Sequence, residues 1–176
     1  MIVCLGWGSL VWDQRELRTK GDWKKDGPYI SVEYIRQSND GRLTLVIDNK
    51  GTPSQVLWAE MQQADFELAK NELRIREGNI LRHHVGAWEK GSKDPSDING
   101  LSDWADSIGC NAVIWTALPP KFNGENNKRP EINEAISYLE NLDNQARILA
   151  EEYIRKTPAQ IRTPYRSKFE EYFGWT

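Results

Sequence analysis

The chain has 176 residues, with 23 Lys and Arg, 26 Asp and Glu, and a formal net charge of −3. This length suits one domain that buries a hydrophobic core without disulfides or metal ions, so we expect a single domain over residues 1–176. Basic stretches that are short and diluted by acidic residues argue against a nucleic-acid partner, and the lack of a run of about 18 apolar residues argues against a membrane partner.

The first residues, 1–5, are apolar and predict a buried strand. No basic segment followed by an apolar segment opens the chain, so we expect no signal peptide and a cytoplasmic protein. Two glycines around one aromatic residue then predict a tight turn that approaches a neighbouring group closely. This turn is Gly6-Trp7-Gly8-Ser9-Leu10. Residues 13–25 are polar and predict a loop or a short helix.

The next part of the chain is rich in strand signals. Asp40-Gly41 is a strong hairpin turn signal between two runs of alternating or β-branched residues. Residues 49–54 contain Gly51 and Pro53 and predict a loop. The predicted strands are residues 29–38, 43–47 and 55–61.

Residues 64–77 change to a helical period, and Gly78 predicts a left-handed cap that ends this helix. Ser102 is positioned to cap a short helix that runs through residue 108. Two further strands are predicted on either side of that helix, and prolines end the second of them. They cover residues 80–88 and 112–118.

The remaining chain has a helical pattern that begins near Pro130. One apolar stripe runs from residue 132 to residue 154, either as one helix or as two helices broken near Asp143. Thr157-Pro158 and Thr163-Pro164 each resemble a cap followed by proline, and Gly174 closes the last helix. This composition change predicts a helical layer rather than a second domain.

The turn at residues 6–10 is the first candidate site. A strand that ends in a glycine turn presents backbone N–H groups, which can hold a carboxylate or a developing oxyanion. It lacks the third glycine of a dinucleotide fingerprint and the Gly-Lys-Ser/Thr of a phosphate loop. The alternative is a tight turn without a ligand, which is the commoner meaning of so short a pattern.

Glu77 is the second candidate, because a carboxylate at a helix C-terminus meets the negative end of the helix dipole and suits a proton-transfer role. The alternative is a solvated helix-end glutamate, which the pattern alone favours. The dipole argument also predicts that Glu77→Gln changes stability little or even raises it.

The other reactive side chains give weaker signals. Adjacent His83 and His84 point to opposite faces if they lie on a strand, so they cannot easily share a metal ion. Cys4 and Cys110 edge apolar runs and are expected to be buried, reduced thiols. No cofactor and no metal ion is expected.

The two candidate sites lie in two longer motifs, which are Val3-Cys4-Leu5-Gly6-Trp7-Gly8-Ser9-Leu10 and Leu73-Arg74-Ile75-Arg76-Glu77-Gly78. Together these motifs resemble those of the γ-glutamylcyclotransferase-like superfamily, and the resemblance covers about residues 1–118. In this chain Trp7 stands where the family usually has Tyr before Gly-Ser, and residues 81–84 replace a Gly-x-Tyr element.

The resemblance implies an α+β fold, a small mixed β-barrel over residues 1–118 flanked by helices, with residues 130–176 as a helical extension. It implies release of 5-oxoproline from a small γ-glutamyl compound, with Glu77 as the catalytic carboxylate. The implied substrate-binding residues are Gly6, Trp7, Gly8, Ser9, Leu10 and Trp12. The alternative is a non-catalytic module that binds a small ligand or a protein on the same fold. The acceptor group and the oligomeric state stay open.

Overall fold

The computed structural model describes all 176 residues and has an α+β fold with five α-helices and two mixed sheets. The chain groups into two compact units, which are described separately below. The first unit is Met1–Ile30 with Gln55–Leu118, and the second is Ser31–Ser54 with Pro119–Thr176. Neither sheet closes on itself, so the prediction of a β-barrel is wrong. A barrel needs its two edge strands to pair, and here each sheet keeps two unpaired edges.

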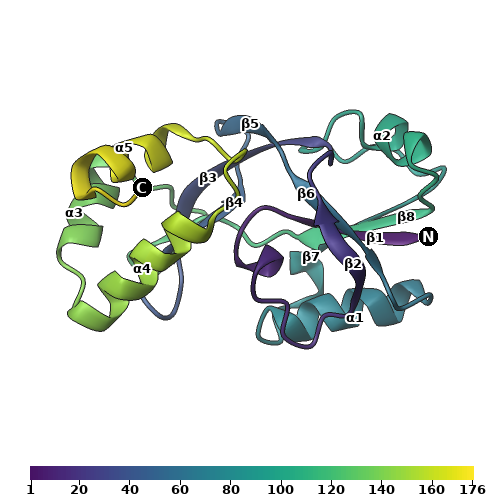
Figure 1. Cartoon of the computed structure of the whole chain (residues 1–176), viewed down its shortest axis with the longest axis horizontal. Helices are drawn as coiled ribbons and strands as arrows, with labels where there is room; N and C mark the ends of the chain where they lie inside the picture. The colour runs from purple at the N-terminus through teal and green to yellow at the C-terminus, as the bar shows by residue number, and fades with distance from the viewer. The chain divides into compact units, whose positions relative to one another are not determined.

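The first unit is built on a five-stranded sheet in the order β2-β6-β1-β8-β7 (Figure 1). β1 lies between β6, to which it is antiparallel, and β8, to which it is parallel. The strands are β1 (Ile2–Gly6), β2 (Thr19–Lys24), β6 (Leu57–Met61), β7 (Val85–Glu89) and β8 (Ala112–Thr116).

Helices cover both faces of this sheet. α1 (Phe66–Arg76) packs Leu73 against a buried apolar cluster that includes Cys4 and Ile114. α2 (Leu101–Ser107) lies on the opposite face, where the Trp104 ring meets the Trp58 ring edge to face at 5.8 Å. The predicted buried strands at the start of the chain and at residues 112–118 are therefore confirmed, because their side chains are enclosed from both sides.

The ends of α1 follow the sequence prediction closely. Asp65 is the N-cap, and its side chain accepts a hydrogen bond from the Leu68 N–H. Gly78 follows the C-cap residue Glu77 and has a φ of +85°, which confirms the left-handed cap. Cys4 and Cys110 are both fully buried free thiols, as predicted.

Three local predictions in the first unit are wrong. Residues 13–25 contain β2, an edge strand whose polar side chains hide its pairing with β6. Residues 82–84 form the short 3₁₀ helix η2 (Arg82–His84), so the predicted strand begins only at Val85. Gly100 rather than Ser102 precedes α2, and the Ser102 N–H donates to the Asp94 carboxylate.

The second unit holds the other sheet, in the order β10-β9-β3-β4, with β5 also paired to β3. The Asp40-Gly41 hairpin is confirmed, since β3 and β4 are antiparallel on either side of it. β5 occupies residues expected to be a loop, because the backbone of this Pro-containing segment pairs along β3. The strands are β3 (Tyr29–Gln37), β4 (Leu43–Ile47), β5 (Thr52–Gln55), β9 (Lys121–Phe122) and β10 (Glu125–Asn126).

Three helices complete this unit: α3 (Ile132–Glu140), α4 (Asn144–Lys156) and α5 (Pro164–Phe173). The apolar stripe is broken at Asp143, which is the N-cap of α4. Thr163 caps α5 with Pro164 in its first turn, as predicted. Thr157, by contrast, ends α4, and no helix follows Pro158.

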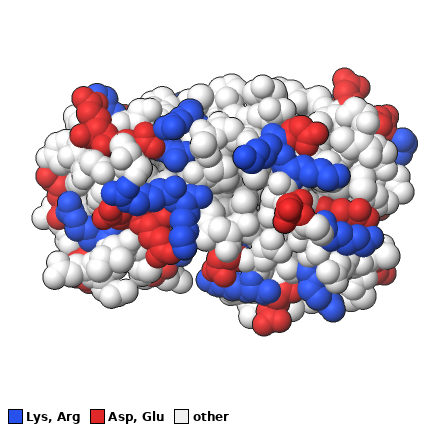
Figure 2. Space-filling view, viewed as in Figure 1, with Lys and Arg blue, Asp and Glu red and all other residues white.

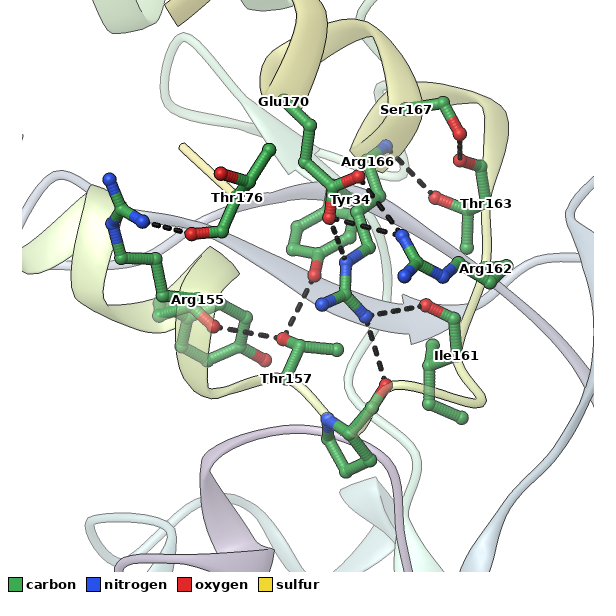
Figure 3. A network of polar contacts seen from close by, with 12 residues as sticks. Tyr34, Arg155, Thr157, Ile161, Arg162, Thr163, Arg166, Ser167, Glu170 and Thr176 are labelled. Atoms are coloured by element: carbon green, nitrogen blue, oxygen red, sulfur yellow. Dashed lines mark hydrogen bonds and ion pairs between the residues drawn. The ribbon is translucent and has the colours of Figure 1, made fainter. Parts of the chain in front are cut away.

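A buried polar network joins β3 to the C-terminal end of α4 and joins α5 to the segment that precedes it (Figure 3). The Tyr34 hydroxyl donates to Thr157 Oγ1 at 2.8 Å, and the Thr157 hydroxyl donates to the Tyr153 carbonyl at 2.9 Å. Arg166, with 5% of its surface exposed, donates to the Pro158 carbonyl at 2.9 Å and pairs with Glu170. These bonds satisfy polar groups that would otherwise be costly inside the core.

The surface carries both signs of charge. Figure 2 shows Lys and Arg side chains interspersed with Asp and Glu over the visible face. Several are paired, such as Lys20 with Glu60 at 2.8 Å and Lys90 with Asp106 at 2.7 Å. No helix combines the length and the apolar composition that crossing a membrane requires.

Candidate functional site

The candidate site lies in the first unit, where β1 ends. The chain leaves β1 at Gly6 and turns through the 3₁₀ helix η1 (Ser9–Val11). The Val11 N–H donates to the Gly8 carbonyl, and the N–H groups of Trp12 and Asp13 both donate to the Ser9 carbonyl. None of these turn-closing hydrogen bonds uses the N–H group of Gly8, Ser9 or Leu10.

The aromatic residues predicted beside the turn differ in exposure. Trp7 and Leu10 are buried, each with 5% of its surface exposed, while Trp12 and Ser9 are half-buried. Trp7 therefore belongs to the wall beneath the turn, and Ser9 is the member that reaches its surface.

Trp23 covers Gly6 and was not predicted. A Cβ atom on Gly6 would lie 2.6 Å from Trp23 Cζ3, so only glycine fits under this indole ring. The Trp23 indole N–H is buried and has no hydrogen-bond partner, and the ring packs against the apolar cluster under α1. Trp23 lies on β2, the strand that the sequence did not reveal.

Glu77 lies at the C-terminal end of α1 with 15% of its side chain exposed. Its Oε1 accepts a hydrogen bond from Arg76 Nη1 at 2.5 Å, and Oε2 makes no hydrogen bond to the protein. The carboxylate is therefore held at one oxygen and free at the other.

Arg76 connects Glu77 with the turn. Its Nη2 donates to Ser9 Oγ at 3.2 Å and to the Asp13 carbonyl at 2.5 Å. The catalytic candidate and the predicted binding turn thus share one guanidinium, although 67 residues separate Ser9 from Arg76.

The Cys4 thiol lies beneath this cluster on β1. Burial raises the pKa of Cys4 strongly, the Glu77 carboxylate raises it further, and Arg76 acts in the opposite direction. Cys4 is therefore a protonated thiol and not a nucleophile.

Arg76 could have been found from the sequence. Ala69, Leu73 and Arg76 are the buried residues of α1, and their spacing of four and three residues marks one helix face. An arginine on the apolar face of a helix needs buried acceptors, so its position indicates a polar site inside the fold.

His83 and His84 lie on η2 with ring centroids 4.3 Å apart, so the expectation that they lie on a strand and point to opposite faces is wrong. No group of three or more His, Cys, Asp or Glu side chains is arranged to hold a metal ion.

No known protein family, characterised protein or solved structure matches this chain significantly. The two sequence motifs and the geometry that joins them are therefore the features that bear on function. Those motifs meet at Arg76, which lies in the glutamate motif and binds Ser9 of the turn motif.

Proposed function

We propose that this protein is a γ-glutamylcyclotransferase-like enzyme that releases 5-oxoproline from a small γ-glutamyl compound. The observation that carries this proposal is the shared guanidinium of Arg76, which bonds to Glu77 Oε1 and to Ser9 Oγ. The reaction needs at least two kinds of group, a carboxylate oxygen that can accept a proton and backbone N–H donors near it.

In the proposed reaction the substrate supplies its own nucleophile. The α-amine nitrogen attacks the γ-carbonyl carbon, a new C–N bond closes the five-membered ring, and the bond to the departing amine breaks. Glu77 takes a proton from the α-ammonium group and returns it to the leaving nitrogen. The attacking nitrogen loses a second proton when it becomes the lactam N–H, and this proton passes through the same carboxylate to the departing amine, which leaves as an ammonium ion. Protons therefore balance and Glu77 is regenerated. The protein contributes a near-attack geometry in place of an enzyme nucleophile.

The turn supplies the complementary charge. The N–H groups of Gly8, Ser9 and Leu10 are not used by the bonds that close η1. In the proposed reaction they donate to the substrate carboxylate or to the oxyanion that develops on the γ-carbonyl. Trp7 and Trp12 line the apolar surroundings of this turn. Preorganised donors of this kind typically contribute about 3–4 kcal/mol each to transition-state stabilisation.

The test is a 5-oxoproline release assay over a panel of γ-glutamyl amino acids, γ-glutamyl peptides and γ-glutamyl amines. We expect turnover of at least one panel member, and activity that survives chelation because the chemistry uses no Lewis acid. Absence of release across the panel, or loss with a chelator and recovery with zinc, would contradict the proposal.

A binding module is the second candidate, because the Arg76–Glu77 pair at 2.5 Å suits a carboxylate that only holds an arginine in place as well as it suits a catalytic one. Calorimetry with the same panel separates the two functions: saturable heat without 5-oxoproline release identifies a binding module.

A further inference from the structure

Arg76 is almost completely buried, with 4% of its side chain exposed. We propose that Arg76 is a positioning residue, whose guanidinium holds the Glu77 carboxylate and residues 9–13 in one fixed arrangement. The effect on catalysis rests on the proposed function, because Arg76 acts on the reaction through Glu77 and does not itself touch the substrate.

The guanidinium binds three groups from two distant parts of the chain. Nη1 donates to Glu77 Oε1 at 2.5 Å. Nε and Nη2 donate to the Asp13 carbonyl at 3.0 and 2.5 Å, and Nη2 also donates to Ser9 Oγ at 3.2 Å. The Asp13 N–H in turn donates to the Ser9 carbonyl at 2.8 Å. Arg76 therefore binds both ends of the turn and the carboxylate at the same time.

This arrangement depends on arginine chemistry. A guanidinium offers five N–H donors in a planar, rigid fork, whereas a lysine ammonium offers three donors on a flexible stem. A lysine at position 76 could keep an ion pair with Glu77, but it could not also bind Ser9 and the Asp13 carbonyl. Arg76→Lys therefore separates the charge of this residue from its geometry.

The helix holds the guanidinium in place. Arg76 lies on the buried face of α1 with Leu73, which has no exposed surface, and its own carbonyl accepts a hydrogen bond from Arg15 Nη1 at 3.4 Å. Since α1 packs on the sheet, the Arg76 position is fixed by the core. The carboxylate and the turn are then fixed relative to each other through one side chain.

The bond to Oε1 makes the two oxygens of Glu77 unequal. Arg76 donates to Oε1 and Oε2 has no protein partner, so Oε2 is the oxygen better placed to take the substrate proton. Small errors in such an arrangement are costly, because a misplacement of about 1 Å can reduce the rate about 100-fold. A loosened Glu77 should therefore lower kcat more than it raises KM.

The test is a double-mutant cycle with Arg76→Lys and Glu77→Gln, measured as kcat and KM for 5-oxoproline release. We expect Arg76→Lys to lower kcat about 10- to 100-fold in the wild-type background. In the Glu77→Gln background it should have almost no further effect, because the group it positions is gone. If Arg76 had only a structural role, Arg76→Lys would lower kcat by the same factor in the wild-type and the Glu77→Gln backgrounds.

Arg74→Lys is the matched control, since Arg74 lies in the same helical turn and bonds only to Asn71.

Amide hydrogen exchange gives a measurement that needs no activity. Arg76→Lys should accelerate exchange at Trp12 and Asp13 and leave Leu73 unchanged, while Arg74→Lys should alter neither region. If Arg76→Lys does not fold, Ser9→Ala replaces it, because that substitution removes one of the guanidinium bonds at a half-buried position.

The outcomes distinguish this inference from the proposed function. Wild-type kcat in Arg76→Lys, or an equal loss with and without Glu77, overturns the positioning role while 5-oxoproline release stands. A wild-type protein that releases none overturns the function. In that case faster amide exchange at Trp12 in Arg76→Lys would still support the role of Arg76 in holding residues 9–13, and unchanged exchange would contradict that role.

Discussion

At the scale of the residue, Glu77 and Glu72 have similar burial and different neighbours. Both lie on or at the end of α1, both have 15% of the side chain exposed, and both pair with an arginine. Glu72 pairs with Arg18, away from the turn, whereas Glu77 shares its arginine with Ser9. The two carboxylates therefore differ in what lies beside them and hardly at all in burial.

We expect Glu77→Gln to lower kcat for 5-oxoproline release by about 10²–10⁴-fold, since Gln cannot accept the ammonium proton. Glu72→Gln should keep kcat.

The free energy of unfolding of Glu77→Gln should fall by about 1–2 kcal/mol, because a charged hydrogen bond to buried Arg76 becomes a neutral one. The sequence alone predicted little change, and the ion pair reverses that expectation. Steady-state kinetics and urea unfolding test both parts, and near-wild-type release by Glu77→Gln would show that the catalytic residue lies elsewhere.

Glu33 is a buried carboxyl in the second unit, with 1% of its surface exposed. Burial raises its pKa, while hydrogen bonds from the Thr163 hydroxyl and the Tyr34 N–H partly oppose the rise. The folded protein therefore holds a proton on Glu33 at pH values where the unfolded chain has lost it. The stability that Glu33 contributes is complete below the unfolded pKa and is lost as pH rises through the folded pKa.

The free energy of unfolding of the wild type minus that of Glu33→Gln should decrease as pH rises from about 4 towards neutrality. Urea unfolding of both proteins across this range measures the difference. A difference that is constant with pH, or that grows as pH rises, would contradict a raised Glu33 pKa.

At the scale of the element, two helices begin with similar caps in different surroundings. Asp143 caps α4 at an exposed position by accepting from the Ala146 N–H at 2.8 Å. Thr163 caps α5, has 2% of its surface exposed, and also donates to Glu33 Oε1 at 2.6 Å. The cap of α5 is therefore part of a buried network, and the cap of α4 is not.

We expect Asp143→Ala to cost about 1 kcal/mol of unfolding free energy, the usual value of an N-cap. Thr163→Ala should cost about 2–3 kcal/mol, because it also removes a hydrogen bond from buried Glu33. Urea unfolding of the two variants at one pH measures the contrast. Equal losses would mean that the Thr163–Glu33 bond adds nothing to the cap.

At the scale of the whole molecule, the chain is shared between the units in an interleaved way. All five strands of the first sheet lie within residues 1–118, but this segment also contains β3 and β4 of the second unit. Tyr34 of β3 has no exposed surface, and its ring packs edge to face on Phe169 of α5 at 5.8 Å. A chain that ends at residue 118 would expose this ring.

We expect a fragment of residues 1–118 to protect the amides of β1 and β8 and to lose protection in β3 and β4. Strands of a hairpin without packing partners are marginally stable in water, whereas the first sheet keeps every strand. Hydrogen exchange followed by mass spectrometry compares the fragment with the full chain. Protection of β4 in the fragment at its full-chain level would contradict the division of the core.

The amino-acid sequence determined the features that depend on neighbours along the chain. Three such features follow from hydrophobic periodicity or turn chemistry within a few residues. They are the Asp40-Gly41 hairpin, the helix that ends before Gly78, and the break at Asp143. Glu77 and the turn at residues 6–10 were located in the same way, as local patterns with possible chemistry.

Tertiary structure decided what depends on partners distant in the sequence. Polar β2 is a strand only because β6 supplies its hydrogen-bond partners, and the sheets stay open because their edge strands do not meet. Arg76 became part of the site through bonds to Ser9 and Asp13, which no pattern near residue 76 records. Periodicity reports which side of an element is buried, whereas the acceptor that a buried donor finds is set by chain packing.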